Sequence, residues 1–131
     1  MNLMNAPMNQ GLILFAHGAR DARWAAPFEA VAQRVRRARP GVAVRLAYLE
    51  LMPPTLPQAG AELVAAGCTT LQVVPMFLGA GGHVRQDLPR LVAALLQAHP
   101  GLQITLHPPV GELGPVADAL AAAALATLVP A

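Results

Sequence analysis

The sequence predicts a three-layer α/β domain with a four-stranded parallel sheet. Strand-like apolar runs alternate with helix-like segments along the chain, and no linker, repeat or low-complexity block interrupts the alternation. A chain of 131 residues fits one domain with a sizeable buried core. Right-handed crossovers between parallel strands place helices on both faces of a sheet, which makes three layers. The pattern does not determine the order of the strands.

Four short apolar runs, each bounded by Gly, Pro or a polar residue, are the predicted strands. They cover residues 11–16, 42–49, 71–76 and 102–107, and we expect all four to be buried. Pro75 stands near the end of the third run, and because proline cannot donate to a strand ladder, we expect that strand to leave the sheet there. Residues 1–10 are rich in Asn and Met and are predicted to form a flexible N-terminal tail. The single domain therefore covers residues 11–131.

The four predicted helices carry local start or stop signals. The first has apolar residues at helical spacing and ends before Pro40. Thr55 and Gln58 form a capping box that begins the second helix, and Asp87 is the predicted N-cap of the third, which has the clearest apolar stripe. The last helix is predicted over residues 115–128 and is rich in Leu and Ala.

Composition argues against several classes of function. The formal net charge is only +2 and aromatic residues make up 4% of the chain, so neither a basic stripe nor a stacking platform for nucleic acid is expected. No apolar stretch reaches the roughly 18 residues of a membrane span, and no signal peptide is evident. Cys68 is the single cysteine and cannot pair internally, which indicates a reduced compartment. We expect a soluble, cytoplasmic protein.

Two histidines and a carboxylate follow the ends of three predicted strands. His17 follows the first strand, Glu50 ends the second, and His83 lies in a glycine-rich loop after the third. Because the carboxyl ends of parallel strands share one edge of a sheet, these side chains are expected to converge there. Imidazole suits Co²⁺, Fe²⁺ or Ni²⁺, and a carboxylate can accept protons. The sequence therefore predicts a divalent-metal site with a general base, and apolar neighbours should partly desolvate Glu50.

Other roles for these residues stay open. His17 could be a structural turn histidine, His83 a flexible loop residue and Glu50 an ordinary exposed carboxylate. The glycine-rich loop could also hold phosphate, but it lacks the Lys-Ser/Thr of a P-loop and the dinucleotide fingerprint, which favours a metal. His107 ends the fourth run, and its role is undecided.

Neighbouring residues supply candidate contacts to a substrate. Arg20, Arg23 and Arg85 lie close in sequence to the two histidines, and guanidinium groups suit recognition of carboxylates. They could equally be surface arginines without such a role. Phe77 and Leu78 could line a ring-sized pocket or pack in the core.

Several motifs resemble those of the small CbiX-type sirohydrochlorin chelatases, in the same order along the chain. They are residues 17–21 (HGARD), Leu49-Glu50 followed by Pro53-Pro54-Thr55, residues 74–78 (VPMFL) leading into 81–84 (GGHV), and residues 108–111 (PPVG). The resemblance spans nearly the whole chain after the tail. It implies a chelatase-like fold related to flavodoxin. It also implies ATP-independent insertion of Co²⁺ or Fe²⁺ into sirohydrochlorin, an acidic tetrapyrrole, in cobalamin or sirohaem biosynthesis.

The resemblance also implies roles for individual residues. His17 and His83 would bind the metal, and Glu50 would complete the catalytic set. The metal ion is then a substrate, so no tightly bound cofactor is expected. The family usually has Ser where Ala19 stands, so a hydroxyl beside His17 is missing. The small form resembles one half of the longer two-lobed chelatases, which implies a homodimer whose two subunits share one cleft.

Two other classes of function compete with this one. A non-catalytic metal-binding or metal-carrier protein of the same fold would use the same histidines without converting a tetrapyrrole. A histidine phosphatase would need an arginine where Ala16 stands. Receiver and flavin-binding domains would need clustered acids or a Ser/Thr-rich loop after the first strand, which this sequence lacks.

Overall fold

The strands form one parallel sheet in the order β2-β1-β3-β4 in the computed structural model, which describes residues 9–79 and 81–130. The strands are β1 (Gln10–Ala16), β2 (Ala43–Tyr48), β3 (Thr70–Pro75) and β4 (Gln103–Leu106). Each strand begins and ends within one residue of its predicted run, which confirms the four-stranded parallel sheet. Of the tail predicted for residues 1–10, residues 1–8 lie outside the described residues. Gln10 already belongs to β1.

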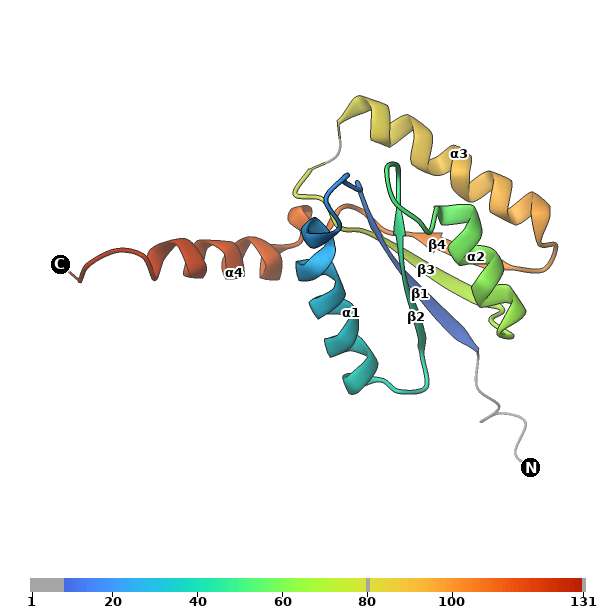
Figure 1. The fold of residues 1–131 in the computed structure, drawn as a ribbon, viewed down its shortest axis with the longest axis horizontal. Coiled ribbons are helices and arrows are strands. Elements are labelled where there is room, and N and C mark those ends of the chain that lie inside the picture. The colour runs from blue at the N-terminus through green and yellow to red at the C-terminus, as the bar shows by residue number, and fades with distance from the viewer. Residues whose placement is uncertain (1–8, 80, 131) are drawn as a thin grey trace.

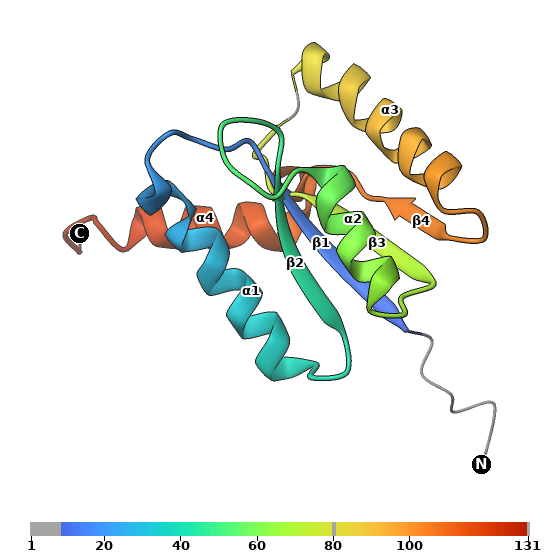
Figure 2. The same ribbon diagram turned by 45° about the vertical axis from the view of Figure 1, so that its right-hand side comes forward.

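Helices cover both faces of the sheet (Figure 1 and Figure 2). A 3₁₀ turn, η2 (Ala22–Ala25), leads into α1 (Ala26–Ala38), which packs on one face against β1 and β2. On the other face lie α2 (Leu56–Ala65) and α3 (Gly82–Ala98), which also pack against each other. The predicted three-layer arrangement is confirmed.

The main core lies between the sheet and the pair α2 and α3. Ile13 and Phe15 of β1 are fully buried there, as are Leu71 and Val73 of β3. Complete burial of such a side chain stabilises the fold by about 1.5–3 kcal/mol. A smaller apolar cluster around Leu14 lies between the sheet and α1. Apolar packing on both faces therefore fixes the two central strands, β1 and β3. The residues that follow their carboxyl ends are positioned by these strands.

The capping box at the start of α2 is confirmed. The backbone N–H of Gln58 donates to Thr55 Oγ1 at 3.2 Å, and the backbone N–H of Thr55 donates to Gln58 Oε1 at 2.8 Å. These two hydrogen bonds satisfy backbone donors that the first helical turn leaves without partners in the helix. They fix the point at which the chain turns from the end of β2 into α2.

The prediction that Asp87 caps α3 is wrong. The helix begins at Gly82 with Gly81 as its N-cap, and the N–H of Arg85 donates to the Gly81 carbonyl at 3.0 Å. Starting earlier adds a full turn of backbone hydrogen bonds, which outweighs the local capping preference of an aspartate. As a result, His83 lies in the first turn of α3 and not in the loop where the sequence placed it.

The final helix, α4 (Gly114–Leu125), extends away from the sheet (Figure 1). It follows a short 3₁₀ turn, η3 (Val110–Glu112), and ends three residues before its predicted end. All of its residues are exposed except the half-buried Val116, and Leu120 is 49% exposed. In the described part of the chain, no helix is long and apolar enough to cross a membrane. An almost entirely apolar helix is thus left without a covering layer.

The edge strand β4 is less buried than the sequence predicts. Its four residues alternate between exposed and half-buried, whereas full burial was expected of every strand. On one face α3 packs against it, but α4 follows β4 in the chain and points away instead of folding back over it. The prediction of four buried strands is therefore wrong for β4.

Candidate metal site

His17 and Glu50 meet at the carboxyl edge of the sheet, as predicted. Hydrogen bonds between the chain segments continue beyond the strands: the N–H of Leu49 donates to the Ala16 carbonyl at 2.9 Å, and the N–H of Glu50 donates to the His17 carbonyl at 3.1 Å. This extension of the ladder brings His17 Nε2 to 3.2 Å from Glu50 Oε1. An imidazole and a carboxylate can share a proton or an ion at that distance.

The pair lies at the surface. The side chains of His17 and Glu50 are 51% and 54% exposed. The expected partial desolvation of Glu50 by its apolar neighbours is therefore not found, because Leu51 also points outward and is 55% exposed. A surface position leaves both groups accessible to a ligand from solvent.

Gly18 is required by the close approach of two loops. Its φ is +98°, and a Cβ at this position would overlap the backbone carbonyl oxygen of Glu50. Only glycine adopts this left-handed conformation at little cost and leaves room for that oxygen. The His17–Glu50 geometry depends on Gly18, which sequence reasoning did not single out. The signal available in the sequence was a glycine directly after the strand-end histidine.

Leu51 has an unusual backbone conformation beside Glu50. Its φ is +71°, which costs a non-glycine residue about 1–2 kcal/mol. The loop is held on its far side by the N–H of Tyr48, which donates to the Pro54 carbonyl at 2.8 Å. This conformation turns an apolar side chain to solvent next to the carboxylate. Sequence reasoning did not find it, because the local sequence contains no glycine or asparagine that would predict a left-handed residue.

Phe77 links the core to the site. Its ring stands edge-on to Phe15, with centroids 6.1 Å apart, and edge-on to His17, with centroids 6.5 Å apart. One side of Phe77 therefore packs against the core and another faces the histidine, while its place in a ring-sized pocket stays a prediction. Its neighbour Leu78 is 69% exposed. The N–H of Gly111 donates to the Phe77 carbonyl at 2.9 Å and ties this segment to η3.

The structure does not bring a third metal ligand to this pair among the side chains it describes. The backbone of His83 lies in the first turn of α3, but its side chain is outside the described residues. In the part of the chain that is described, no group of three or more His, Cys, Asp or Glu side chains could hold a metal ion. Among the described side chains, the candidate site at this edge is therefore the His17–Glu50 pair, and His83 remains a predicted ligand.

The candidate arginines have different surroundings. Arg23 donates to Asp21 Oδ2 at 2.8 Å, and Asp21 also caps η2 by accepting from the backbone N–H of Arg23 at 2.9 Å. These bonds raise the pKa of Arg23 and lower that of Asp21. Arg20 and Arg85 are exposed. Ala19, which stands where the resembled family usually has Ser, is half-buried.

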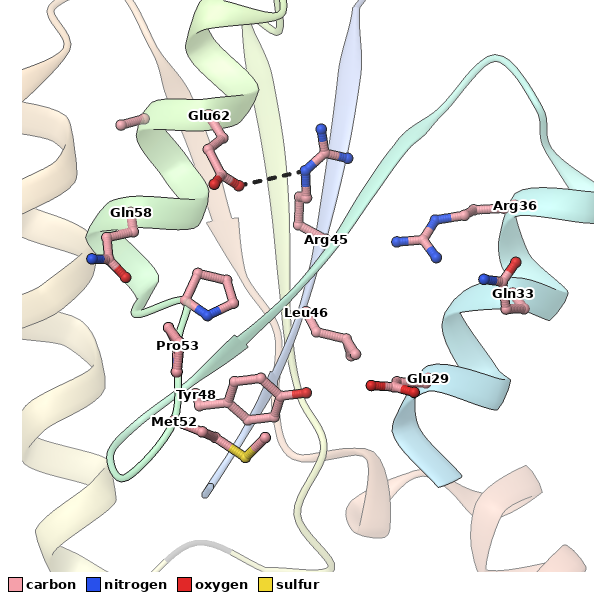
Figure 3. A pocket seen from close by; sticks show the side chains of 12 residues that line it. Glu29, Gln33, Arg36, Arg45, Leu46, Tyr48, Met52, Pro53, Gln58 and Glu62 are labelled. Atoms are coloured by element: carbon pink, nitrogen blue, oxygen red, sulfur yellow. Dashed lines mark ion pairs between the residues drawn. The ribbon is translucent and has the colours of Figure 1, made fainter. Parts of the chain in front are cut away.

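A wide hollow of about 880 Å³ lies elsewhere, on the outer edge of β2 between α1 and α2 (Figure 3). Arg45 Nε and Glu62 Oε2 face each other there at 3.6 Å. Arg36 and Arg45 both donate to the Val44 carbonyl, at 2.9 and 3.0 Å, and occupy an acceptor on the outer edge of the sheet. None of the predicted site residues whose side chains the structure describes lines this hollow, so its size does not make it the candidate site.

The fold and the His17–Glu50 pair define a parallel α/β domain with an imidazole–carboxylate site at its carboxyl edge. The chain belongs to the CbiX family, whose profile matches residues 11–126. It is 30% identical to the sirohydrochlorin cobaltochelatase of Methanocaldococcus jannaschii over 90 residues, which are 69% of this chain. The same match covers 63% of that relative, so the chain spans less than two thirds of its length.

Solved structures show the same fold. A CbiX protein of Marinobacter aquaeolei assigned to cobalamin (vitamin B12) biosynthesis matches with a TM-score of 0.79 and 33% identity, over 90% of this chain and 96% of that one. The sirohydrochlorin chelatase SirB of Bacillus subtilis subspecies spizizenii, solved in complex with cobalt, matches with a TM-score of 0.64 and 26% identity. This second match covers 77% of this chain but only 43% of SirB. The chain thus corresponds to about one half of a longer chelatase.

Proposed function

We propose that this protein inserts a divalent metal, Co²⁺ or Fe²⁺, into sirohydrochlorin without ATP. The observation that carries the proposal is the 3.2 Å contact between His17 and Glu50 at the carboxyl edge of the sheet, within the motifs of the CbiX family. The names of the relatives, a cobaltochelatase and a cobalt-bound chelatase, support the choice of substrate and metal.

His17 is proposed to receive the metal ion. When Nε2–H donates to Glu50, the lone pair of Nδ1 is free to bind a borderline cation such as Co²⁺ or Fe²⁺. A carboxylate that accepts from the other nitrogen of a metal-binding imidazole fixes the orientation of the ring. His83 is proposed as the second imidazole ligand, since the first turn of α3 carries it at the same edge of the sheet.

Glu50 is proposed to be the proton acceptor. Insertion of one M²⁺ ion displaces two pyrrole N–H protons, so the charge of the macrocycle does not change and both protons must leave. An exposed carboxylate beside the metal ligand can take each proton in turn and release it to water. The base and the metal ligand therefore act on the same face of the macrocycle.

Apolar and basic residues around the pair are proposed to hold the macrocycle. Phe77 stands edge-on to His17, and the exposed Leu51 and Leu78 lie on the loops that follow β2 and β3. Flat apolar contacts suit the ring, while Arg20 and Arg23 would meet its carboxylates through charge-assisted hydrogen bonds.

A second copy of the chain is proposed to complete the cleft. One chain corresponds to less than half of SirB, and α4 leaves apolar residues such as Leu120 and Leu125 at the surface. Two-fold dimers are the commonest way to cover such a surface. The second copy would supply the opposite wall around a macrocycle too broad for one subunit.

The proposal is tested by an anaerobic assay in which the visible spectrum of sirohydrochlorin is followed after addition of Co²⁺, Fe²⁺ or Ni²⁺. The expected result is a protein-dependent conversion to the metallated spectrum with Co²⁺ or Fe²⁺, faster than the spontaneous reaction. Insertion no faster than in buffer for all three ions would contradict the proposal.

A further inference from the structure

A small apolar pocket lies next to the site, on the side of the sheet that faces α3. It has a volume of about 170 Å³ and runs between the first turns of α3 and the ends of β3 and β4. The described residues that line it are Pro75, Phe77, Val84, Arg85, Leu88, Pro89, Leu106, His107 and Pro109. Nothing in the proposed metal chemistry accounts for this pocket.

The pocket and the metal site share Phe77. Alternate residues of a strand point to the same face, so Ile13, Phe15 and then His17 follow one face of the sheet, the face covered by α2 and α3. Phe77 continues the corresponding face of β3 and stands edge-on to His17. A planar ligand centred over His17 therefore reaches the pocket when the ligand extends past Phe77 toward α3.

The size and lining of the pocket restrict what can fill it. An apolar cavity of about 150 Å³ stays dry and holds a single small ring, so the present volume suits a short alkyl chain of a few carbon atoms. Arg85 is the one permanent charge among the described lining residues, and it projects from an exposed position of α3. An alkyl stem that ends in a carboxylate matches both features.

We propose that this pocket binds one carboxyalkyl arm of the substrate macrocycle, with the alkyl stem against Val84 and Leu106 and the carboxylate at Arg85. This inference rests on the proposed function and adds a subsite to it. By fixing one arm, the pocket sets the rotation of the macrocycle about the axis through its centre. The pyrrole nitrogens then lie over His17 and Glu50 in one orientation.

The test is the dissociation constant of metal-free sirohydrochlorin, measured by its change in absorbance on titration with the protein. Val84→Phe on α3 and Leu106→Phe on β4 each enlarge a side chain that lines the pocket, and each is expected to raise the dissociation constant by about tenfold or more. Val31→Phe makes the same change at a half-buried position of α1 on the other face of the sheet, and its dissociation constant should stay within about twofold of the wild type. Co²⁺ binding without the macrocycle should be unchanged in all three.

Arg85→Gln provides a test that does not disturb the core, because the side chain is exposed. It should weaken macrocycle binding by about tenfold at low ionic strength and less at high salt. Wild-type affinity in Arg85→Gln, or in a pocket-filling variant with a native circular dichroism spectrum, would overturn the proposed subsite. If the wild-type protein itself does not bind sirohydrochlorin, the proposed function fails, and the subsite with it.

Discussion

His17 and Glu50 lie 3.2 Å apart, Nε2 to Oε1, although 33 residues separate them in the chain. The contact exists because β1 and β2 are neighbours in the sheet and their ladder continues through the Glu50 N–H and the His17 carbonyl. One group that can bind a metal and one that can accept a proton are thus held side by side by backbone hydrogen bonds.

Removal of either histidine should greatly reduce metal insertion. His17→Ala and His83→Ala are each expected to lower the insertion rate by about 100-fold or more while the fold is retained, because the His17 side chain is exposed and residue 83 lies in the first turn of α3. Initial rates and circular dichroism of both variants check this. His99→Ala, at the far end of α3, is the matched control and should insert metal normally. A near-normal rate in either site variant would refute the ligand role of that histidine.

Glu50→Gln should separate metal binding from turnover. The amide keeps the shape of the side chain but cannot accept a proton at neutral pH, so Co²⁺ should still bind while the insertion rate falls by about 100-fold or more. Metal titration and initial rates at several pH values measure both effects. Glu62→Gln changes a carboxylate in the hollow beside β2 and serves as the control. An unchanged rate across the pH range in Glu50→Gln would exclude Glu50 from the mechanism.

Gly18→Ala should damage both stability and activity. The added methyl group would overlap the Glu50 carbonyl oxygen, and the alanine backbone would have to adopt a φ of +98°. The loops that carry residue 18 and Glu50 would therefore have to move apart. We expect a loss of at least about 1 kcal/mol in the free energy of unfolding, measured with urea, and a large loss of insertion. Gly41→Ala is the control, because no atom lies within 4 Å of the added methyl group there. Equal stability and activity of the two variants would contradict the account of this turn.

Cys68 should resist alkylation in the native protein. Burial raises the pKa of its thiol, with a smaller opposing effect of Arg45, so the reactive thiolate forms only at a higher pH than in an unfolded chain. Folding therefore favours the thiol form, and this contribution to stability is present below the unfolded pKa and lost as the pH rises through the folded one. Iodoacetamide labelling rates against pH, native and in urea, measure the difference. Coinciding native and unfolded profiles would contradict it.

The protein should be a homodimer in solution. Sedimentation at micromolar concentration is expected to give twice the mass of the chain, and Leu120→Glu, on the exposed surface of α4, should weaken the association. Gln97→Glu, on an exposed position of α3, introduces a similar charge away from α4 and should leave the dimer intact. A monomer that keeps full activity on dilution would contradict the shared cleft.

Local signals predicted most of the fold. The capping box of Thr55 and Gln58 was predictable because the two partners are three residues apart, and the strands were predictable because each is a short apolar run bounded by Gly, Pro or a polar residue. The start of α3 was not predictable. Asp87 has the local pattern of an N-cap, and nothing in the sequence shows that the helix already begins at Gly82. The direction of α4 was not predictable, because its almost uniformly apolar residues do not mark one face for burial.

At the site, chemistry was predictable and backbone geometry was not. The convergence of His17 and Glu50 followed from the shared edge of parallel strands. The support from Gly18 arises from a close approach to Glu50, 32 residues away in the chain, which local preference does not encode. The positive φ of Leu51 was not predictable either, because no nearby glycine or asparagine marks it. The exposure of Glu50 was not predicted, because its apolar neighbour Leu51 is itself exposed and does not cover the carboxylate.

The number of macrocycles metallated per subunit tests the central claim most directly. With Co²⁺ and sirohydrochlorin both in large excess over the protein under anaerobic conditions, a catalyst converts many macrocycles per subunit above the spontaneous background, whereas a metal carrier converts none beyond it. We predict many turnovers for the wild-type protein and loss of this turnover in His17→Ala. A protein that binds Co²⁺ but produces no metallated sirohydrochlorin above background would contradict the account.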